Sequence, residues 1–306
     1  MSAMFASAEE ASARLAGAGY LPSPDIAIAV FLADRLEKPI LVEGPAGVGK
    51  TELGRAFAEA SGRRLVRLQC YEGLDEAKAL YEWEYAKQLL YTQMLRDRIG
   101  EAIGGAGTLA EAADRIAAEG NVFFSERFLL PRPILQAVTS HVPVLLLVDE
   151  VDKADPEFEA FLLEVLADYA VTVPEVGTFK ARHLPRVVLT SNASRELSDA
   201  LKRRCLHLYI DFPTLERELG IVRARVPEAS EGLARQAVAA VARLRGMDLR
   251  KPPSIAETLD WVRALVLLGV GSLEPGLVSD TLHLLVKHQG DAEKARARAR
   301  EVAGGT

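Results

Sequence analysis

The fold is decided by the stretch Gly44-Pro45-Ala46-Gly47-Val48-Gly49-Lys50-Thr51, which fits the phosphate-binding pattern G-x-x-x-x-G-K-[ST]. Backbone N–H groups must approach polyphosphate oxygens closely, and bulky side chains at the glycines would hold them away. The Lys50 ammonium supplies charge to the β- and γ-phosphates, and the Thr51 hydroxyl is an oxygen ligand for Mg²⁺. The stretch therefore predicts a P-loop that binds a nucleoside triphosphate.

The residues around this loop support the same interpretation. Residues 39–43 are typical of a short buried strand, and residues 51–58 of a helix whose positive N-terminal end faces the phosphates. A glycine-rich turn without a ligand is the alternative, and the strand–loop–helix setting disfavours it. The expected nucleotide-binding residues are Gly44, Pro45, Ala46, Gly47, Val48, Gly49, Lys50, Thr51 and Glu52.

A second apolar run ends in two acids, Val144-Leu145-Leu146-Leu147-Val148-Asp149-Glu150. A run without alternation suits a parallel strand covered on both faces, and open α/β sheets bind ligands at the carboxyl ends of such strands. We expect Asp149 to hold the water shell of Mg²⁺ and Glu150 to orient and polarise the attacking water. The alternative is a surface acidic turn, to which Asp152 and Asp155 can belong. The acid pair favours hydrolysis over binding alone.

Composition narrows the setting. The chain has 306 residues, 49% hydrophobic and 26% charged, which is enough for one large and one small domain. A net charge of −6 weighs against a dedicated nucleic-acid binder. Two isolated cysteines suggest a reducing compartment, and Glu9 and Glu10 argue against a signal peptide. The apolar segment near residues 261–270 contains Arg263 and is too short to span a bilayer. We expect a cytoplasmic protein.

The pattern of apolar residues predicts an α/β nucleotide-binding domain at residues 1–212 and a helical lid domain at residues 213–306. A helical insertion is expected at about 84–120, with helices at 87–103 and 109–118, and a β-hairpin at about 170–182, with strands at 170–173 and 179–182. Further strands are expected at 64–70, 186–192 and 206–210. Helical signals continue to about residue 288, followed by a charged tail.

Four features make the chain resemble AAA+ ATPases of the MoxR group. They are Gly44–Thr51, Leu145–Asp152, Leu189-Thr190-Ser191-Asn192 and Asp199-Ala200-Leu201-Lys202-Arg203-Arg204-Cys205. Residues 69–85 make the chain most similar to the branch associated with maturation of molybdenum-containing carbon monoxide dehydrogenases. The resemblance covers nearly the whole chain from Tyr20 onward.

The resemblance implies a fold and partners. The fold is a five-stranded parallel sheet in AAA+ order with flanking helices and an all-helical C-terminal lid. The implied protein is an ATP-hydrolysing, Mg²⁺-dependent chaperone that forms a ring, usually a hexamer. It acts with a von Willebrand A-domain protein on a metalloenzyme client. No membrane insertion is expected.

Carried over to this sequence, the resemblance gives roles to three polar residues. Asn192 resembles the sensor-1 residue, which bonds the γ-phosphate or the attacking water; a strand-end Asn that caps a turn is the alternative. Arg203 and Arg204 resemble the arginine-finger position, and Arg204 aligns better. Two solvated arginines at a helix end are the alternative there. The hairpin at 170–182 resembles the pre-sensor-1 insertion, which faces clients or neighbouring subunits.

One departure concerns the lid. Many relatives have a sensor-2 Arg where this chain has Ile255, within Lys251-Pro252-Pro253-Ser254-Ile255-Ala256. Either Arg250 or Lys251 takes its place at the γ-phosphate, or the lid couples weakly to the nucleotide. The sequence lacks the Asn-Lys-x-Asp motif of guanine-specific sites, which favours ATP.

Other function classes stay open at this point. An AAA+ motor on DNA or RNA is disfavoured by the acidic balance. A nucleotide-gated scaffold with little turnover is favoured by Ile255 and disfavoured by the Asp149–Glu150 pair. A small-molecule kinase fits the helical lid and the two arginines less well than a ring ATPase does.

Overall fold

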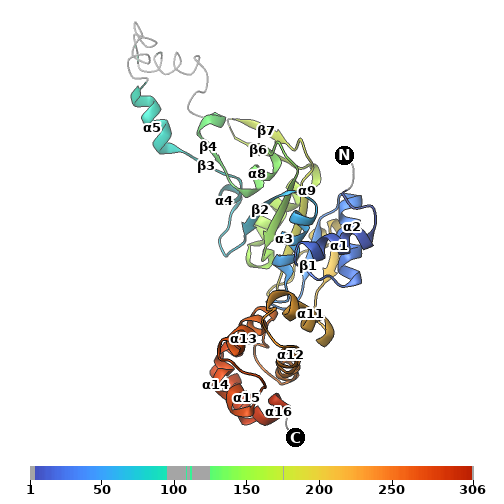
Figure 1. Ribbon diagram of the computed structural model, residues 1–306. Helices are drawn as coiled ribbons and strands as arrows, with labels where there is room; N and C mark the ends of the chain where they lie inside the picture. Colours follow the sequence, from blue (N-terminus) through green and yellow to red (C-terminus); the bar gives the residue numbers. More distant parts are fainter. Residues whose placement is uncertain (1–3, 95–107, 109–110, 112–124, 175, 305–306) are drawn as a thin grey trace.

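The structure is a computed structural model that describes residues 4–94, 108, 111, 125–174 and 176–304. An α/β region is followed along the chain by a separate group of helices that ends at the C-terminus (Figure 1). The predicted helix at 109–118, except residue 111, lies outside the described residues. So does the part of the predicted helix at 87–103 that follows residue 94.

Five parallel strands form the central sheet, in the order β2-β5-β8-β1-β9. These strands are β1 (Ile40–Glu43), β2 (Arg64–Gln69), β5 (Val144–Asp149), β8 (Arg186–Ser191) and β9 (Leu206–Tyr209). The predicted five-stranded parallel sheet is confirmed, although β2, β8 and β9 each end one residue earlier than the sequence pattern suggested. Their carboxyl ends all lie at one edge of the sheet.

Helices cover both faces of this sheet. In β5, Leu145 and Leu147 point to a core shared with Phe57, whereas Leu146 and Val148 point to a core shared with Phe158. This alternation is what a strand buried on both faces requires. The first face carries α1 (Ala8–Gly17), α2 (Pro24–Leu36) and α3 (Lys50–Ala60). The second carries α4 (Glu76–Leu80), α8 (Pro133–Val138), α9 (Pro156–Asp168) and α10 (Asp199–Arg204).

Two small antiparallel pairs lie beside the main sheet. The hairpin joins β6 (Ala170–Val173) to β7 (Gly177–Lys180), so its second strand begins two residues before the expected position 179. The other pair, β3 (Tyr81–Trp83) with β4 (Leu129–Pro131), was missed because three residues are too few to show alternation. Beyond β3, helix α5 (Tyr85–Met94) extends away from the sheet (Figure 1). Two 3₁₀ turns complete this region, Glu126–Phe128 and Val151–Lys153.

The C-terminal helices enclose their own core around the fully buried Trp261, whose indole N–H donates to Thr281 Oγ1 at 2.8 Å. The helices are α11 (Leu215–Arg225), α12 (Glu231–Arg245), α13 (Ile255–Leu267), α14 (Pro275–Leu285), α15 (Gln289–Ala297) and α16 (Ala299–Ala303). The expected charged tail after residue 288 is therefore helical, because Ala295 and Val302 bury an apolar face in this core.

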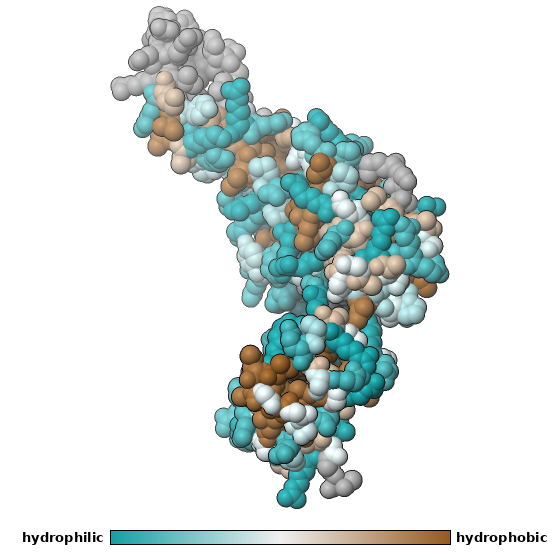
Figure 2. Space-filling model, viewed as in Figure 1, coloured by the Kyte–Doolittle hydropathy of each residue, from teal (hydrophilic) through white to brown (hydrophobic). Residues whose placement is uncertain are grey.

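Apolar side chains also gather on the surface of this helical region (Figure 2). Among the described residues there, Leu267 and Leu268 at the end of α13 are 87% and 61% exposed. A second exposed apolar row lies on α2, where Ile28, Leu32 and Leu36 follow at four-residue spacing and so share one side of the helix. Both surfaces are available for protein contacts.

A buried carboxylate ties the N-terminal helices to the sheet. Asp34, fully buried on α2, accepts hydrogen bonds from the backbone N–H groups of Met4 and Phe5 at 2.7 and 3.4 Å. The same carboxylate lies 3.0 Å from Arg186 Nε and 3.5 Å from Arg63 Nη2, and both guanidinium groups are buried. Removing this charge would leave two buried cations without their shared partner.

We therefore expect Asp34→Asn to lower the free energy of unfolding by about 3–5 kcal/mol, the usual effect of breaking a buried ion pair. Urea unfolding followed by circular dichroism measures it. Glu37→Gln is the matched control, since Glu37 also pairs with Arg186, at 3.0 Å, but its side chain is 43% exposed. The control should lose no more than about 1 kcal/mol. Equal losses in both variants would contradict the assigned role of Asp34.

Candidate functional site

The carboxyl ends of three adjacent strands bring together residues that are far apart in the sequence. Lys50 Nζ donates to the carbonyl oxygens of Gly44 and Pro45 at 2.8 and 2.6 Å and to Asn192 Oδ1 at 2.8 Å. Asn192 Nδ2 in turn donates to Glu150 Oε1 at 3.2 Å. The P-loop after β1, the acid after β5 and the amide after β8 thus form one hydrogen-bonded chain.

Asp149 is linked to the start of α3. Thr51 Oγ1 donates to Asp149 Oδ1 at 2.8 Å, and Thr190 Oγ1 donates to the same oxygen at 2.5 Å. Thr190 also accepts the backbone N–H of Glu150 at 2.9 Å, which helps to hold that residue in a left-handed conformation with φ 57°. No role was predicted for Thr190, although it lies in the stretch that pointed to Asn192.

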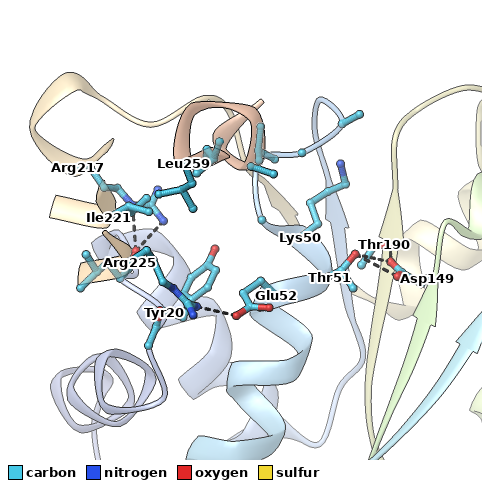
Figure 3. A pocket seen from close by; sticks show the side chains of 18 of the residues that line it. Tyr20, Lys50, Thr51, Glu52, Asp149, Thr190, Arg217, Ile221, Arg225 and Leu259 are labelled. Carbon is cyan, nitrogen blue, oxygen red and sulfur yellow. Dashed lines mark hydrogen bonds and ion pairs between the residues drawn. The ribbon is translucent and has the colours of Figure 1, made fainter. Parts of the chain in front are cut away.

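These residues line a cavity of about 450 Å³ between the sheet edge and the C-terminal helices (Figure 3). Most of the predicted phosphate-binding loop lies on its wall, together with both acids and Asn192. Its opposite wall comes from Tyr20, from α11 and from α13. Burial raises the pKa of the Tyr20 hydroxyl, and the nearby Arg217 guanidinium opposes that shift.

The P-loop conformation depends on glycine at two positions. Gly44 has φ 151°, and a Cβ there would lie 1.9 Å from the carbonyl oxygen of Ile210. Gly47 has φ 76°, and a Cβ there would lie 2.2 Å from Ser254 Cβ. The backbone of Gly44 therefore lies against the end of β9, and the backbone of Gly47 against the start of α13. A side chain at either position would prevent this close approach.

The C-terminal helices contact the P-loop directly. The backbone N–H of Ile255, at the first turn of α13, donates to the Gly47 carbonyl at 3.1 Å. From α11, Arg217 donates to the Leu21 carbonyl at 2.9 and 3.0 Å, and Arg225 bonds the Gly19 carbonyl and Glu52 at 3.0 and 2.8 Å. Glu52, expected near the nucleotide, thus lies at the cavity wall in an ion pair with α11.

Ile255, which stands where the resemblance leads us to expect a sensor-2 arginine, lines the cavity. Arg250 and Lys251 are not among the residues that line the cavity. Their backbone N–H groups instead bond the Asp291 carboxylate at 3.0 and 3.2 Å. Arg263 does line the cavity but lies eight residues along α13, about 12 Å from its start at the P-loop.

Arg203 and Arg204 lie at the end of α10, and both are exposed. Neither is among the residues that line the cavity. Within one chain, the structure therefore does not bring these two predicted residues to the P-loop.

Electrostatics distinguish the charged residues of the site. Burial lowers the pKa of Lys50, against the raising effect of Asp152, Asp149 and Glu150. Asp152 could belong to a surface acidic turn on the alternative interpretation of the sequence, but it is only 3% exposed. Its burial would raise the pKa of its carboxyl, yet hydrogen bonds from Ser194 and from the backbone of Asn192 and Asp152 together outweigh burial, and the pKa is lowered. Asp155 remains exposed.

Three further residues contact the acid pair and were not predicted from the sequence. Arg67 Nη2 lies 2.5 Å from Asp149 Oδ2. Glu150 Oε2 accepts from Gln69 Nε2 at 2.9 Å and from Lys153 Nζ at 2.6 Å. Arg67 belongs to no motif, and Gln69 was noted only as the first residue of the stretch 69–85 that resembles one branch. The pairing of β2 with β5, which sets Gln69 opposite Asp149, brings both residues to the site.

Residues 39–205 match the family model described as AAA domain (dynein-related subfamily), which spans more than half of the chain. The chain belongs to this family. The matched segment includes the P-loop, Asp149, Glu150 and Asn192, and it ends just after Arg204. Membership makes the protein an AAA+ P-loop ATPase by family, and the confirmed sheet order agrees with it.

Two individual proteins show a more limited similarity to this chain than the family model does. Lon protease 2 of Herpetosiphon aurantiacus is 38% identical over 101 residues, which are 32% of this chain and 12% of that protein. The chain thus spans only a small part of this curated relative. A point mutant of RuvB from Thermotoga maritima is 15% identical, with a TM-score of 0.47, over 85% of this chain and 68% of that chain. That similarity is too distant to carry an argument about function.

Clusters of metal ligands and membrane-spanning helices are both absent from the described residues. Within them, no cluster of three or more His, Cys, Asp or Glu side chains is arranged to hold a metal ion. Equally, none of the helices in the described ranges has the length and apolar character needed to cross a membrane.

The contact at Gly44 generates a prediction. We expect Gly44→Ala to weaken nucleotide binding at least about tenfold, because its Cβ would meet a backbone oxygen that cannot move aside and would displace the P-loop. Titration with a fluorescent ATP analogue measures the affinity. The matched control is Gly73→Ala, since Gly73 also has a positive φ, of 79°, but nothing lies within 4 Å of its added Cβ. Unchanged affinity in Gly44→Ala would refute the close fit of this loop.

Proposed function

We propose that this protein binds ATP with Mg²⁺ in the cavity at the sheet edge and hydrolyses it. The observation that carries the proposal is the hydrogen-bonded chain from Lys50 through Asn192 to Glu150. It puts a buried cation, a neutral amide and a carboxylate at the positions that phosphate binding, water orientation and water activation require.

The residues fit both groups that the family implies. Gly44 and Gly47 leave the P-loop backbone free of side chains, and the buried Lys50 ammonium can exchange its bonds to loop carbonyls for phosphate oxygens. Thr51 and Asp149 offer oxygen atoms, which Mg²⁺ prefers, and Mg²⁺ commonly takes only one or two protein ligands beside phosphates and water. When bound, Mg²⁺ neutralises charge on the phosphates.

In the proposed reaction, the P-loop N–H groups and Lys50 hold the phosphates. Glu150 accepts a proton from the attacking water, and Asn192, already bonded to Glu150, orients that water. Gln69 and Lys153 bond the other oxygen of Glu150 and restrain its side chain. ATP is proposed over GTP because the sequence lacks the Asn-Lys-x-Asp motif.

We further propose that the site is completed by a neighbouring copy of the chain in a ring, with six subunits as the expected number. Arg204, with Arg203 beside it, is exposed and remote from the cavity of its own chain, as a finger acting on the next subunit must be. The exposed apolar rows on α2 and at the end of α13 are suitable contacts for such an assembly.

The finer proposal is a MoxR-type chaperone that works with a von Willebrand A-domain partner on a metalloenzyme client, for example a molybdenum-containing carbon monoxide dehydrogenase. Its support is the sequence resemblance, together with the β6–β7 hairpin at the place where this group has a client- or neighbour-facing insertion. A nucleotide-gated scaffold with little turnover is the second candidate. It is favoured by the apolar Ile255 at the cavity and by the bonds that restrain Glu150.

Glu150→Gln tests hydrolysis. The amide keeps the shape of the side chain but cannot accept the proton, so we expect ATP affinity to be retained and phosphate release to fall by about 10²-fold or more. Lys50→Ala is the comparison variant and should lose ATP binding itself, since the phosphates lose their main cationic partner. Wild-type phosphate release close to zero would favour the scaffold, and normal turnover in Glu150→Gln would refute Glu150 as the base.

Arg204→Ala tests the ring. We expect nucleotide affinity to be unchanged and turnover to fall by about 10³-fold, the effect of losing such a finger. Mixing this variant with Lys50→Ala should restore part of the activity, because one interface can then combine an intact P-loop with an intact finger. Arg203→Ala serves as the neighbouring control. If neither arginine affects turnover, or if co-assembled variants never complement, the finger acting between subunits is wrong.

A further inference from the structure

The two acids of the site are connected to each other through the edge strand β2. Arg67 Nη2 donates to Asp149 Oδ2 at 2.5 Å and to Gln69 Oε1 at 2.6 Å. Gln69 Nε2 then donates to Glu150 Oε2 at 2.9 Å. A continuous path therefore runs from Asp149 through Arg67 and Gln69 to Glu150.

Arg67 determines how the Gln69 amide is oriented. A guanidinium group can only donate hydrogen bonds, so the amide atom that faces it must be the oxygen. The amide NH₂ group is then directed at Glu150, where it holds one carboxylate oxygen. The two N–H protons of Arg67 Nη2 suffice for both of its bonds, so Arg67 anchors Asp149 and Gln69 at the same time.

The position of Arg67 makes these bonds easy to break. Asp149 is 2% exposed, whereas the Arg67 side chain is 39% exposed and lies on the outermost strand of the sheet. Moving it into solvent requires no repacking of the core. By contrast, Thr51 and Thr190 hold Asp149 from inside the fold, both at Oδ1, and Thr51 Oγ1 also lies 3.1 Å from Oδ2.

We propose that Arg67 is a positioning residue that occupies Asp149 until Mg²⁺ is loaded, and that its departure loosens the hold of Gln69 on Glu150. The inference rests on the proposed ATP and Mg²⁺ site. Arg67 and a divalent cation repel each other beside one carboxylate, so Mg²⁺ loading favours the conformation in which Arg67 has left Asp149. Gln69 then loses the donor that fixed its amide. This weakens one of the two contacts to Glu150 Oε2, because Lys153 Nζ bonds the same oxygen at 2.6 Å.

Nucleotide binding without turnover tests this. A fluorescent, non-hydrolysable ATP analogue is titrated with Mg²⁺, and the Mg²⁺ concentration for half-maximal tightening of binding is measured. Arg67→Met removes the competing cation at similar length, so this concentration should fall by about three- to tenfold, while affinity in EDTA stays unchanged. Arg64→Met is the matched control. Arg64 carries the same charge on β2 but pairs opposite Val144, at the other end of the strand from Asp149, and should leave the Mg²⁺ requirement unchanged.

The path through Gln69 is tested by linkage. Gln69→Leu removes one of the two anchors of Arg67, so it should lower the Mg²⁺ requirement by less than Arg67→Met does. The double variant should behave like Arg67→Met alone, because both substitutions break the same path. Full additivity, or no effect of Gln69→Leu, would overturn the role of Gln69 as an anchor of Arg67.

The remaining outcomes separate the inference from the proposed function. An unchanged or higher Mg²⁺ requirement in Arg67→Met, with nucleotide affinity in EDTA intact, would overturn the role of Arg67 and leave the ATP site standing. If the wild-type protein bound no nucleotide under any condition, the proposed function would fail, and the inference would fail with it.

Discussion

One buried ammonium group holds the site together. Lys50 bonds two carbonyl oxygens of its own loop and the amide of Asn192, so it fixes the P-loop against the end of β8 before any ligand is bound. Burial lowers its pKa, and three nearby carboxylates oppose that shift. A cation in this position needs anionic partners, and the phosphates of a nucleotide satisfy the need better than neutral carbonyl groups do.

The C-terminal helices contact the P-loop region through hydrogen bonds from the backbone and from arginine side chains. The contact is a backbone hydrogen bond from Ile255 to Gly47, with Arg217 and Arg225 of α11 bonded to the chain at Leu21 and Gly19. The Gly47 contact leaves no room for a Cβ, so a shift of the P-loop toward Ser254 would press on the start of α13. This steric contact can thus couple the helical region to the loop beside the ion pair between Arg225 and Glu52.

Much of this molecule followed from the sequence for a simple reason. Apolar runs without alternation identify strands covered on both faces. The P-loop follows one such run, and the acid pair and Asn192 each stand at the end of another. These runs made the strands that carry Glu150 and Asn192 predictable, whereas the five-stranded parallel sheet and the role of Asn192 were implied by the resemblance to the MoxR group. Short or charged segments were not predictable: β3, β4 and the helices after residue 288 carry too little pattern, and their partners lie elsewhere in the chain.

By itself, the sequence determined which residues can bind phosphate and activate water, because those roles need particular side chains at fixed spacing. Only the tertiary structure decided what surrounds them. Strand pairing put Arg67 and Gln69 beside the acids, packing of α13 put Ile255 rather than Arg250 or Lys251 at the cavity, and Asp152 became a buried acid held by Ser194. Such contacts join residues distant in sequence, and sequence spacing carries no record of them.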